Sequence, residues 1–344
     1  MTDFGQIITA MVTPFKAENK HEIDFAATER LIEHLVNNGS DSIIISGTTG
    51  ESPTLSHDEE VELFLCAQKK IKALEQRHSL SEKLPDARLA SHVGAELTEQ
   101  SIMTTHYERN AADGASRAGC KIIFGAGSNC TQTSIKMSLK AQELGADAVL
   151  IVTPYYNKPN QKGLLAHFSL IAEATNLPII LYNVPSRTNI SLTAETIIEL
   201  NSQYPQICSL KEASSNIDII TQLRSKLKAK DFSIYSGDDS LTLPMLAVGA
   251  NGVISVASHL VGNQMQEMIR AFNTGDHVKA QEIQAKLMPL FDTLFIEPNP
   301  TCIKEALGII GMCSAILREP LVALSQEQRQ DLKKTIESLQ TVLN

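Results

Sequence analysis

The sequence predicts an α/β protein built as a (β/α)8 barrel with a C-terminal helical extension. Short apolar runs alternate with segments of helical periodicity, which is typical of repeated βα units. Eight such runs can be counted, and eight parallel strands close into a barrel. The 344 residues accommodate one barrel of about 250 residues and additional helices. We expect the strands to begin at Ile7, Ser42, Ile122, Ala148, Pro178, Ile207, Phe232 and Gly252.

The first two units show the alternation clearly. The apolar run 7–12 is followed by apolar residues at helical spacing over 24–38. The next apolar run, 42–45, leads into a glycine-flanked turn. Ser56 then has the position of an N-cap and acidic residues follow it, so a helix is expected from there to about Leu74.

Helical periodicity also separates the later strands and continues after the last one. Between strands, helices are expected over 131–144, 163–174, 193–201, 217–227 and 241–248. After residue 261 the periodicity is only helical, over 263–272, 276–291, 301–310 and 326–343. We therefore expect a catalytic barrel domain over 1–262 and a C-terminal helical domain over 263–344, packed on the barrel flank or used as an oligomer contact.

A polar segment interrupts the alternation at about residues 75–117, between the second helix and the third strand. It is poor in large aliphatic residues and reads as an insertion that forms an added helix or is partly disordered. Its place at the amino end of the barrel should spare the chemistry, although it could influence assembly. A doubly wound open sheet is the competing fold, but Gly125-Ala126-Gly127 lacks the third glycine of a dinucleotide-binding turn.

Composition excludes several functions. A net charge of −9 argues against nucleic-acid binding, which requires clustered lysine and arginine. No positive leader precedes an apolar core, and no apolar stretch reaches membrane-spanning length, so a cytoplasmic protein without membrane contact is expected. The six scattered cysteines form no CxxC pair and predict reduced thiols rather than a zinc site or disulfides.

The run 207–210 leads directly to Lys211. A buried parallel strand would place this lysine at its carboxyl end, where barrel enzymes have their active site. Loss of hydration lowers the pKa of an ammonium, so a neutral amine becomes available to attack a carbonyl. Lys211 is therefore our candidate for a Schiff-base nucleophile, against the alternative of a surface lysine that merely ends a strand.

Polar residues follow the other strands at the same rim. Thr48 and Thr49 lie in a glycine-flanked turn that could hold a carboxylate, although such a turn is often only structural. Tyr155-Tyr156 follow the fourth strand, and Tyr182 and Arg187 follow the fifth. Phenols can relay protons and a guanidinium can bind a carboxylate, so their convergence with a lysine favours carbonyl chemistry over packing roles.

Several motifs resemble the pyruvate-dependent class I aldolases of the dihydrodipicolinate synthase and N-acetylneuraminate lyase superfamily. They occur in the family's order over nearly the whole chain apart from the insertion: Gly47-Thr48-Thr49-Gly50-Glu51-Ser52, Thr153-Pro154-Tyr155-Tyr156-Asn157-Lys158-Pro159, Tyr182-Asn183-Val184-Pro185-Ser186-Arg187-Thr188, Lys211-Glu212-Ala213, Ser236-Gly237-Asp238-Asp239, Gly252-Val253-Ile254-Ser255 and Asn299-Pro300.

The resemblance implies a role for each matching residue. Lys211 would form an imine with pyruvate, and Tyr182 would act as the nearby general acid and base. Thr48 and Tyr156 would complete a proton relay, with Tyr156 entering a neighbouring subunit's site. Substrate would be bound by Thr49, Arg187, Gly237 and Ile254. Such enzymes use no metal and no organic cofactor.

Within the superfamily the resemblance is strongest to the synthase branch, which condenses pyruvate with aspartate 4-semialdehyde in the diaminopimelate route to lysine. Arg187 sits where synthases bind the carboxylate of the semialdehyde, whereas lyases of sugar acids such as N-acetylneuraminate tend to lack it. Those lyases are the alternative function. A catalytically silent paralogue that senses pyruvate or an amino acid is a second alternative, but the full set of catalytic residues disfavours it.

The resemblance also implies a homo-oligomer, a dimer or a tetramer, with a possible lysine effector site at Ser52, His57, Asn129 and Tyr155. Two positions depart from the inhibited enzymes. Glu60 replaces a histidine, and Thr133 replaces the glutamate that pairs with the amine of lysine. Since the exchange alters charge at a small cationic site, we expect weak or absent feedback by lysine.

Overall fold

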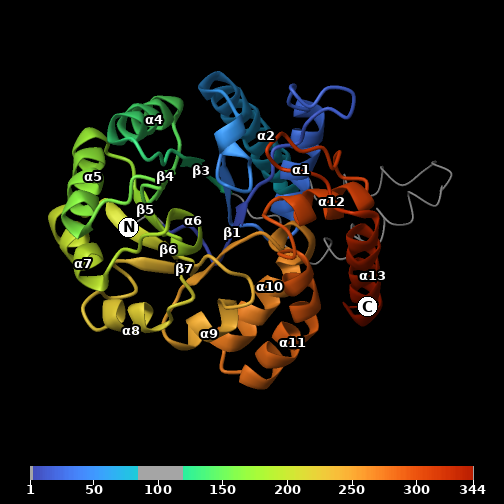
Figure 1. The fold of residues 1–344 in the computed structure, drawn as a ribbon. Coiled ribbons are helices and arrows are strands. Elements are labelled where there is room, and N and C mark those ends of the chain that lie inside the picture. Colours follow the sequence, from blue (N-terminus) through green and yellow to red (C-terminus); the bar gives the residue numbers. More distant parts are fainter. Residues whose placement is uncertain (1–2, 84–118, 344) are drawn as a thin grey trace.

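The computed structural model describes residues 3–83 and 119–343, and its centre is a closed barrel of eight parallel strands in the order β1 to β8 (Figure 1). This confirms the predicted fold class. Three observed strand starts differ from the prediction by one residue. The strands are β1 Ile7–Ala10, β2 Ser42–Ile45, β3 Lys121–Gly125, β4 Ala148–Val152, β5 Ile179–Asn183, β6 Ile207–Glu212, β7 Ser233–Ser236 and β8 Gly252–Ser255.

Each strand is apolar on both faces because one face fills the barrel and the other packs on helices. Along β2, Ile44 belongs to the inner cluster, whereas Ile43 and Ile45 belong to the outer one. Along β6 the register against β5 shifts between Ile207 and Ser209. Beyond this shift Leu210 belongs to the outer cluster, so its neighbour Lys211 faces the barrel interior.

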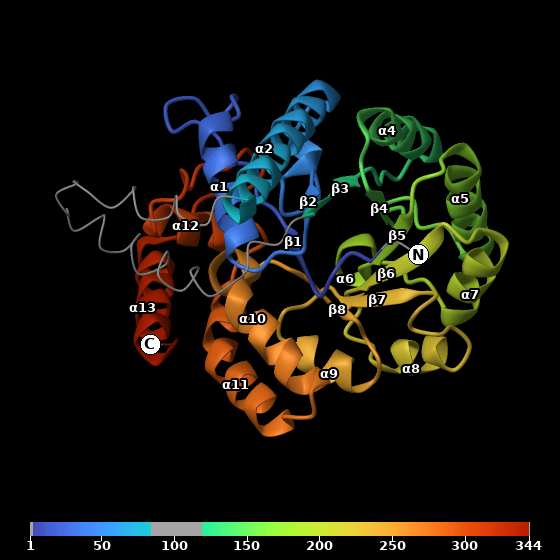
Figure 2. The ribbon, with the colours of Figure 1, turned by 180° about the vertical axis from the view of Figure 1, so that it is seen from behind.

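Helices run between the strands and cover the barrel (Figures 1 and 2). Side-chain caps mark several beginnings, such as Asp24, which accepts the N–H of Ala27 at the start of α1. The covering helices are α1 Phe25–Asn37, α2 His57–Lys83, α4 Thr131–Leu144, α5 Gln161–Ala174, α7 Ala194–Gln203, α8 Asp218–Arg224, α9 Thr242–Ala247 and α10 Ser258–Asn273, with short turns η1 Ser52–Thr54 and α6 Pro185–Thr188.

Two helices differ from their predicted bounds by five residues or more, and the other bounds differ by at most three. The end of α2 lies at Lys83, past the predicted end near Leu74, so the polar segment first continues this helix. The rest of the predicted insertion lies outside the described residues. The start of α10 lies at Ser258 rather than at residue 263, with a kink at Val261 (φ −128°, ψ 31°). The division after residue 262 falls inside this helix and stays a prediction.

The extension contains α11 His277–Thr293, α12 Thr301–Ile309 and α13 Gln326–Leu343. Contacts join α11 to α10 and α13, and α12 to α10 and α13. Both views show these helices on the side of the barrel where α10 lies (Figures 1 and 2). Among the described residues, none of the helices is long and apolar enough to cross a membrane.

Candidate active site

Lys211 occupies the fifth position of β6, near the carboxyl end of the barrel. Its neighbours in strand register are Tyr182 on β5 and Tyr235 on β7. Only 7 % of its surface is exposed, and its Nζ lies 4.5 Å from the centre of the Tyr182 ring. The lysine that the sequence singled out is therefore a buried amine beside a phenol.

Burial lowers the pKa of Lys211 from 10.5 to about 8, which outweighs the opposing effect of the Asp239 carboxylate; the Arg187 guanidinium lowers the pKa further. At a pKa of about 8, roughly a tenth of the amines are neutral at pH 7, against about one in 3,000 for an ordinary lysine. The environment thus raises the nucleophilic fraction by more than two orders of magnitude.

Tyr182 is also buried, on the inner face of β5. Burial raises the pKa of its phenol, whereas Arg187 and a hydrogen bond from the Thr48 side chain lower the pKa. A phenol next to a neutral amine and a hydroxyl can pass a proton in either direction. The structure therefore brings three of the predicted residues, Lys211, Tyr182 and Thr48, together.

The turn after β2 carries Thr48 and Thr49, of which Thr48 is half-buried and Thr49 is buried. The backbone N–H of Glu51 donates to the Thr48 carbonyl at 3.0 Å, which closes the turn. The Thr49 hydroxyl accepts a hydrogen bond from the side-chain amide of Asn299 at 2.8 Å. The loop before α12 is therefore hydrogen-bonded to this turn.

Gly237 lies against the nucleophile. A Cβ added there would be 3.2 Å from Cε of Lys211, 2.6 Å from Cβ of Ala213 and 3.1 Å from the Glu212 carbonyl oxygen. Any larger residue would displace the lysine or the backbone, which accounts for glycine at this position. Ile254 lies on the inner face of β8, opposite Ile8, and belongs to the same inner cluster as Tyr182.

Among the residues predicted for catalysis and substrate binding, Arg187 and Tyr156 are exposed. Arg187 lies in the short helix α6, at the rim and close enough to act on the pKa of both Lys211 and Tyr182. Tyr156 is 90 % exposed and has a positive φ of 72° in the loop after β4. A single chain therefore does not bury the second phenol in its own site.

The predicted effector residues lie on three loops at the same end of the barrel. Ser52 begins η1 and His57 begins α2, whereas Asn129 follows β3 and Tyr155 follows β4. His57 Nδ1 lies 3.1 Å from Oε2 of Glu60. Burial raises the pKa of the Glu60 carboxyl to about 6, against the opposing effect of His57.

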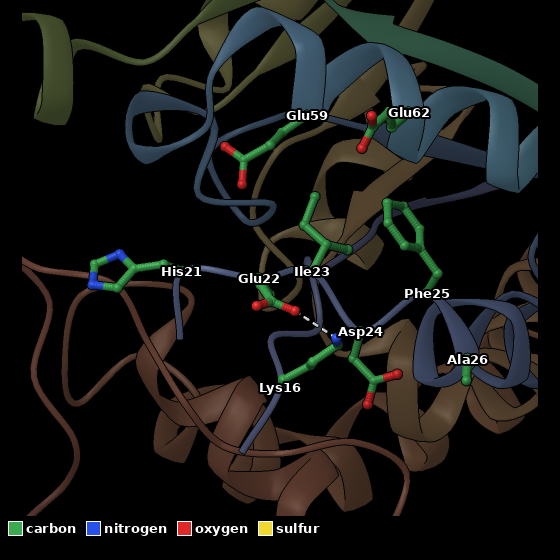
Figure 3. A pocket seen from close by; sticks show the side chains of 9 residues that line it. All are labelled: Lys16, His21, Glu22, Ile23, Asp24, Phe25, Ala26, Glu59 and Glu62. Atoms are coloured by element: carbon green, nitrogen blue, oxygen red, sulfur yellow. Dashed lines mark hydrogen bonds and ion pairs between the residues drawn. The ribbon is translucent and has the colours of Figure 1, made fainter. Parts of the chain in front are cut away.

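A cavity of about 430 Å³ opens elsewhere, between the start of α1 and α2 (Figure 3). Lys16 and Glu22 face each other across its floor at 2.5 Å, and none of the predicted site residues lines it. The cavity is therefore separate from the interior where Lys211 lies. Its lining residues are Lys16, His21, Glu22, Ile23, Asp24, Phe25, Ala26, Glu59 and Glu62.

The structure adds one residue that the sequence did not assign. Asp239 follows β7, is 1 % exposed, and accepts the N–H groups of Val256 and Ala257 at 3.1 and 2.9 Å through Oδ2. Its charge raises the pKa of Lys211. The only sequence signal was its place in the motif after the seventh strand, where a paired aspartate carries no role by itself.

Comparisons with known proteins all point to one family. The model of the dihydrodipicolinate synthetase family matches residues 3–116 and 95–339. The 4-hydroxy-tetrahydrodipicolinate synthase of Cyanothece sp. (strain PCC 7425) is 45 % identical, with 98 % of this chain and 99 % of the relative covered. That of Bacillus subtilis (strain 168) is 41 % identical, with 98 % and 100 % covered.

Solved structures give the same result. A DHDPS from Cyanidioschyzon merolae with lysine bound has a TM-score of 0.81 at 40 % identity, with 98 % of each chain covered. The 4-hydroxy-tetrahydrodipicolinate synthase of Methylacidiphilum fumariolicum SolV has a TM-score of 0.82 at 36 % identity, covering 98 % of this chain and 97 % of the other.

Proposed function

Because the chain belongs to the dihydrodipicolinate synthetase family, we propose that its reaction proceeds through an imine between Lys211 and pyruvate. The reaction is the lyase-class condensation of pyruvate with aspartate 4-semialdehyde to 4-hydroxy-tetrahydrodipicolinate. Relatives of that name over nearly the full length confirm this prediction and favour it over a sugar-acid lyase. The observation that carries the proposed mechanism is the buried amine beside Tyr182.

In the first step the neutral Lys211 amine attacks the C2 carbonyl of pyruvate. The oxygen takes up two protons, one released by the amine and one from solvent, both passed on by the Tyr182 phenol with Thr48 as its hydrogen-bond partner. The oxygen then leaves as water, and the product is a cationic imine. Thr49, through its hydroxyl and N–H, and Gly237, by leaving space, hold pyruvate against Lys211.

In the second step the imine nitrogen withdraws electrons, so a methyl proton of pyruvate leaves and an enamine forms. The enamine carbon then attacks the aldehyde of the second substrate, whose oxygen takes a proton from the relay. Arg187 binds the carboxylate of that substrate, since a guanidinium offers two parallel donors at the rim. Ile254, buried in the same inner cluster as Tyr182, supplies an apolar wall to the site.

The proposal is tested by trapping. Protein mixed with pyruvate and reduced with borohydride should gain mass on the peptide that contains Lys211, and turnover should be seen with aspartate 4-semialdehyde but not with N-acetylneuraminate. Absence of an adduct at Lys211 in an active preparation would contradict the mechanism.

We also propose a cytoplasmic location, which suits the six free cysteines.

We propose a homo-oligomer in which Tyr156 enters the partner's site, since this phenol is 90 % exposed in one chain. Lys211→Ala and Tyr156→Phe should each be nearly inactive alone. Oligomers formed by refolding an equal mixture should regain about a quarter of wild-type activity, the share of complete sites for random pairing in a dimer.

The matched control is a mixture of Lys211→Ala with Tyr182→Phe. Both residues belong to one site of one chain, so that mixture should regain nothing. Lack of recovery with Tyr156→Phe, when native mass spectrometry shows mixed oligomers, would exclude the exchange of Tyr156 between subunits.

Inhibition by lysine is expected to be weak or absent. Thr133 supplies no charge for the amine of lysine, and Glu60 already contacts His57 at 3.1 Å. Initial rates should change little up to millimolar lysine, and Thr133→Glu should increase the sensitivity. An inhibition constant in the micromolar range for the wild type would contradict this prediction.

A further inference from the structure

The turn that carries Thr48 and Thr49 ends in an unusual residue. Glu51 is 2 % exposed and has a positive φ of 56°, a conformation that a non-glycine residue rarely adopts. Burial also removes the hydration of the Glu51 carboxylate, which costs free energy unless the charge is paired. Both costs require compensating contacts, and these come from the C-terminal part of the chain.

Lys304 of α12 supplies the first contact. Its Nζ lies 2.6 Å from Oε1 of Glu51, and the two side chains are 0 and 1 % exposed. The same ammonium lies 4.0 Å from the centre of the Phe15 ring, after β1. The pair therefore joins α12 to the loops after the first two strands in a region that is shielded from solvent.

Arg318 supplies the second contact. Its backbone N–H donates to Oε2 of Glu51 at 3.0 Å. Its guanidinium donates to the carbonyl of Thr54 at 2.8 Å and to Glu59 of α2 at 2.6 Å. Both carboxylate oxygens of Glu51 are thus bound, and the segment that follows the turn is held by the same arginine.

We propose that Glu51 and Lys304, together with Asn299, are positioning residues that hold the Thr48–Thr49 turn in its pyruvate-binding geometry before substrate arrives. Asn299 acts directly on the Thr49 hydroxyl, to which it donates at 2.8 Å. Lys304 lies three residues after the start of α12 and acts on the turn indirectly, through its ion pair with Glu51. Substrate then binds to a turn that needs no ordering, which preserves the orientation required for attack. This inference rests on the proposed function.

The test compares Lys304→Met with Arg329→Met in the full chain, at a temperature well below the lower Tm. Arg329 pairs with Glu305, the neighbour of Lys304 on α12, at 2.6 Å, so its loss weakens the extension without touching the turn. Lys304→Met is expected to raise KM for pyruvate by about 10- to 100-fold, the scale of a displaced binding group, with KM for aspartate 4-semialdehyde nearly unchanged. Arg329→Met should change neither.

Asn299→Ala is the second variant, because it removes only the contact to Thr49 and leaves the ion pair. It should raise KM for pyruvate in the same selective way with little change in Tm. A fall in kcat with both KM values unchanged, or equal effects of Lys304→Met and Arg329→Met, would overturn the positioning role and leave a structural one.

Borohydride trapping separates this inference from the mechanism beneath it. If wild type traps pyruvate at Lys211 and Lys304→Met traps it with the same concentration dependence, the positioning role is wrong and the imine stands. If wild type traps nothing at Lys211, the imine mechanism itself fails.

Discussion

Replacing Lys211 by methionine is expected to abolish the condensation in a protein that still folds. Methionine keeps most of the side-chain length but has no amine, so no imine can form. Loss of a nucleophile lowers kcat by on the order of 10⁴-fold or more. The measurement is kcat with both substrates, together with the intact mass after reduction with pyruvate, where no adduct should appear.

The same variant tests the desolvation of the amine. The folded-state pKa of Lys211 is about 8, below the ordinary 10.5, so the unfolded chain binds this proton more tightly. Above pH 10.5 the amine is neutral in both states, so its burial costs the folded state no charge desolvation. As pH falls from 10.5 through 8, the unfolded chain gains the proton first and this stability is lost. The full loss is about 3 kcal/mol, since one pKa unit corresponds to about 1.4 kcal/mol.

This loss can be isolated by denaturant unfolding of wild type and Lys211→Met at pH 7 and pH 10.5. The free energy of unfolding of wild type, relative to that of the variant, should rise with pH, because other titrating groups are common to both proteins. A difference that stays flat would show that the amine is hydrated and would remove the basis for its reactivity.

Tyr182→Phe is expected to lower kcat by about 10²- to 10⁴-fold, the usual contribution of a positioned acid or base. The ring that lies 4.5 Å from the lysine Nζ is retained, so packing around the amine should persist. The pyruvate adduct should still form, but more slowly, because the imine step loses its proton donor. An unchanged kcat would assign the relay to another group.

Tyr235→Phe is the matched control. Tyr235 is also buried and lies beside Lys211 in strand register, but its hydroxyl donates to the Gly5 carbonyl at 3.0 Å, toward the amino end of the barrel. Its loss should cost about 1 kcal/mol of stability, as for one hydrogen bond, and leave kcat within about twofold. A large loss of kcat for Tyr182→Phe together with a nearly unchanged kcat for Tyr235→Phe would assign the proton transfer to Tyr182.

Much of the fold could be predicted because strands buried on both faces give continuous apolar runs. Ser42–Ile45 and Ala148–Val152 were predicted with the correct start for that reason. The end of α2 was missed because the residues after Leu74 are polar and lack a stop signal, yet the helix continues to Lys83. A helical segment without an apolar face has little hydrophobic periodicity, so its end cannot be predicted from that pattern.

The site was predictable where a residue lies at the carboxyl end of its strand, as Lys211 and Tyr182 do. The contacts of Glu51 were not, because Lys304 and Arg318 lie more than 250 residues away and no local pattern links them. Tyr156 could be named from its motif, but it is 90 % exposed in one chain, so its entry into a partner's site stays a prediction.

The ion pair between Glu51 and Lys304 also bears on how the protein is made. A ribosome that has just released the eighth strand has synthesised every side chain proposed to act in catalysis, but Glu51 still lacks its cation, because Lys304 follows some fifty residues later. On the proposed positioning role, competence to bind the keto acid is gained only after α12 has been made.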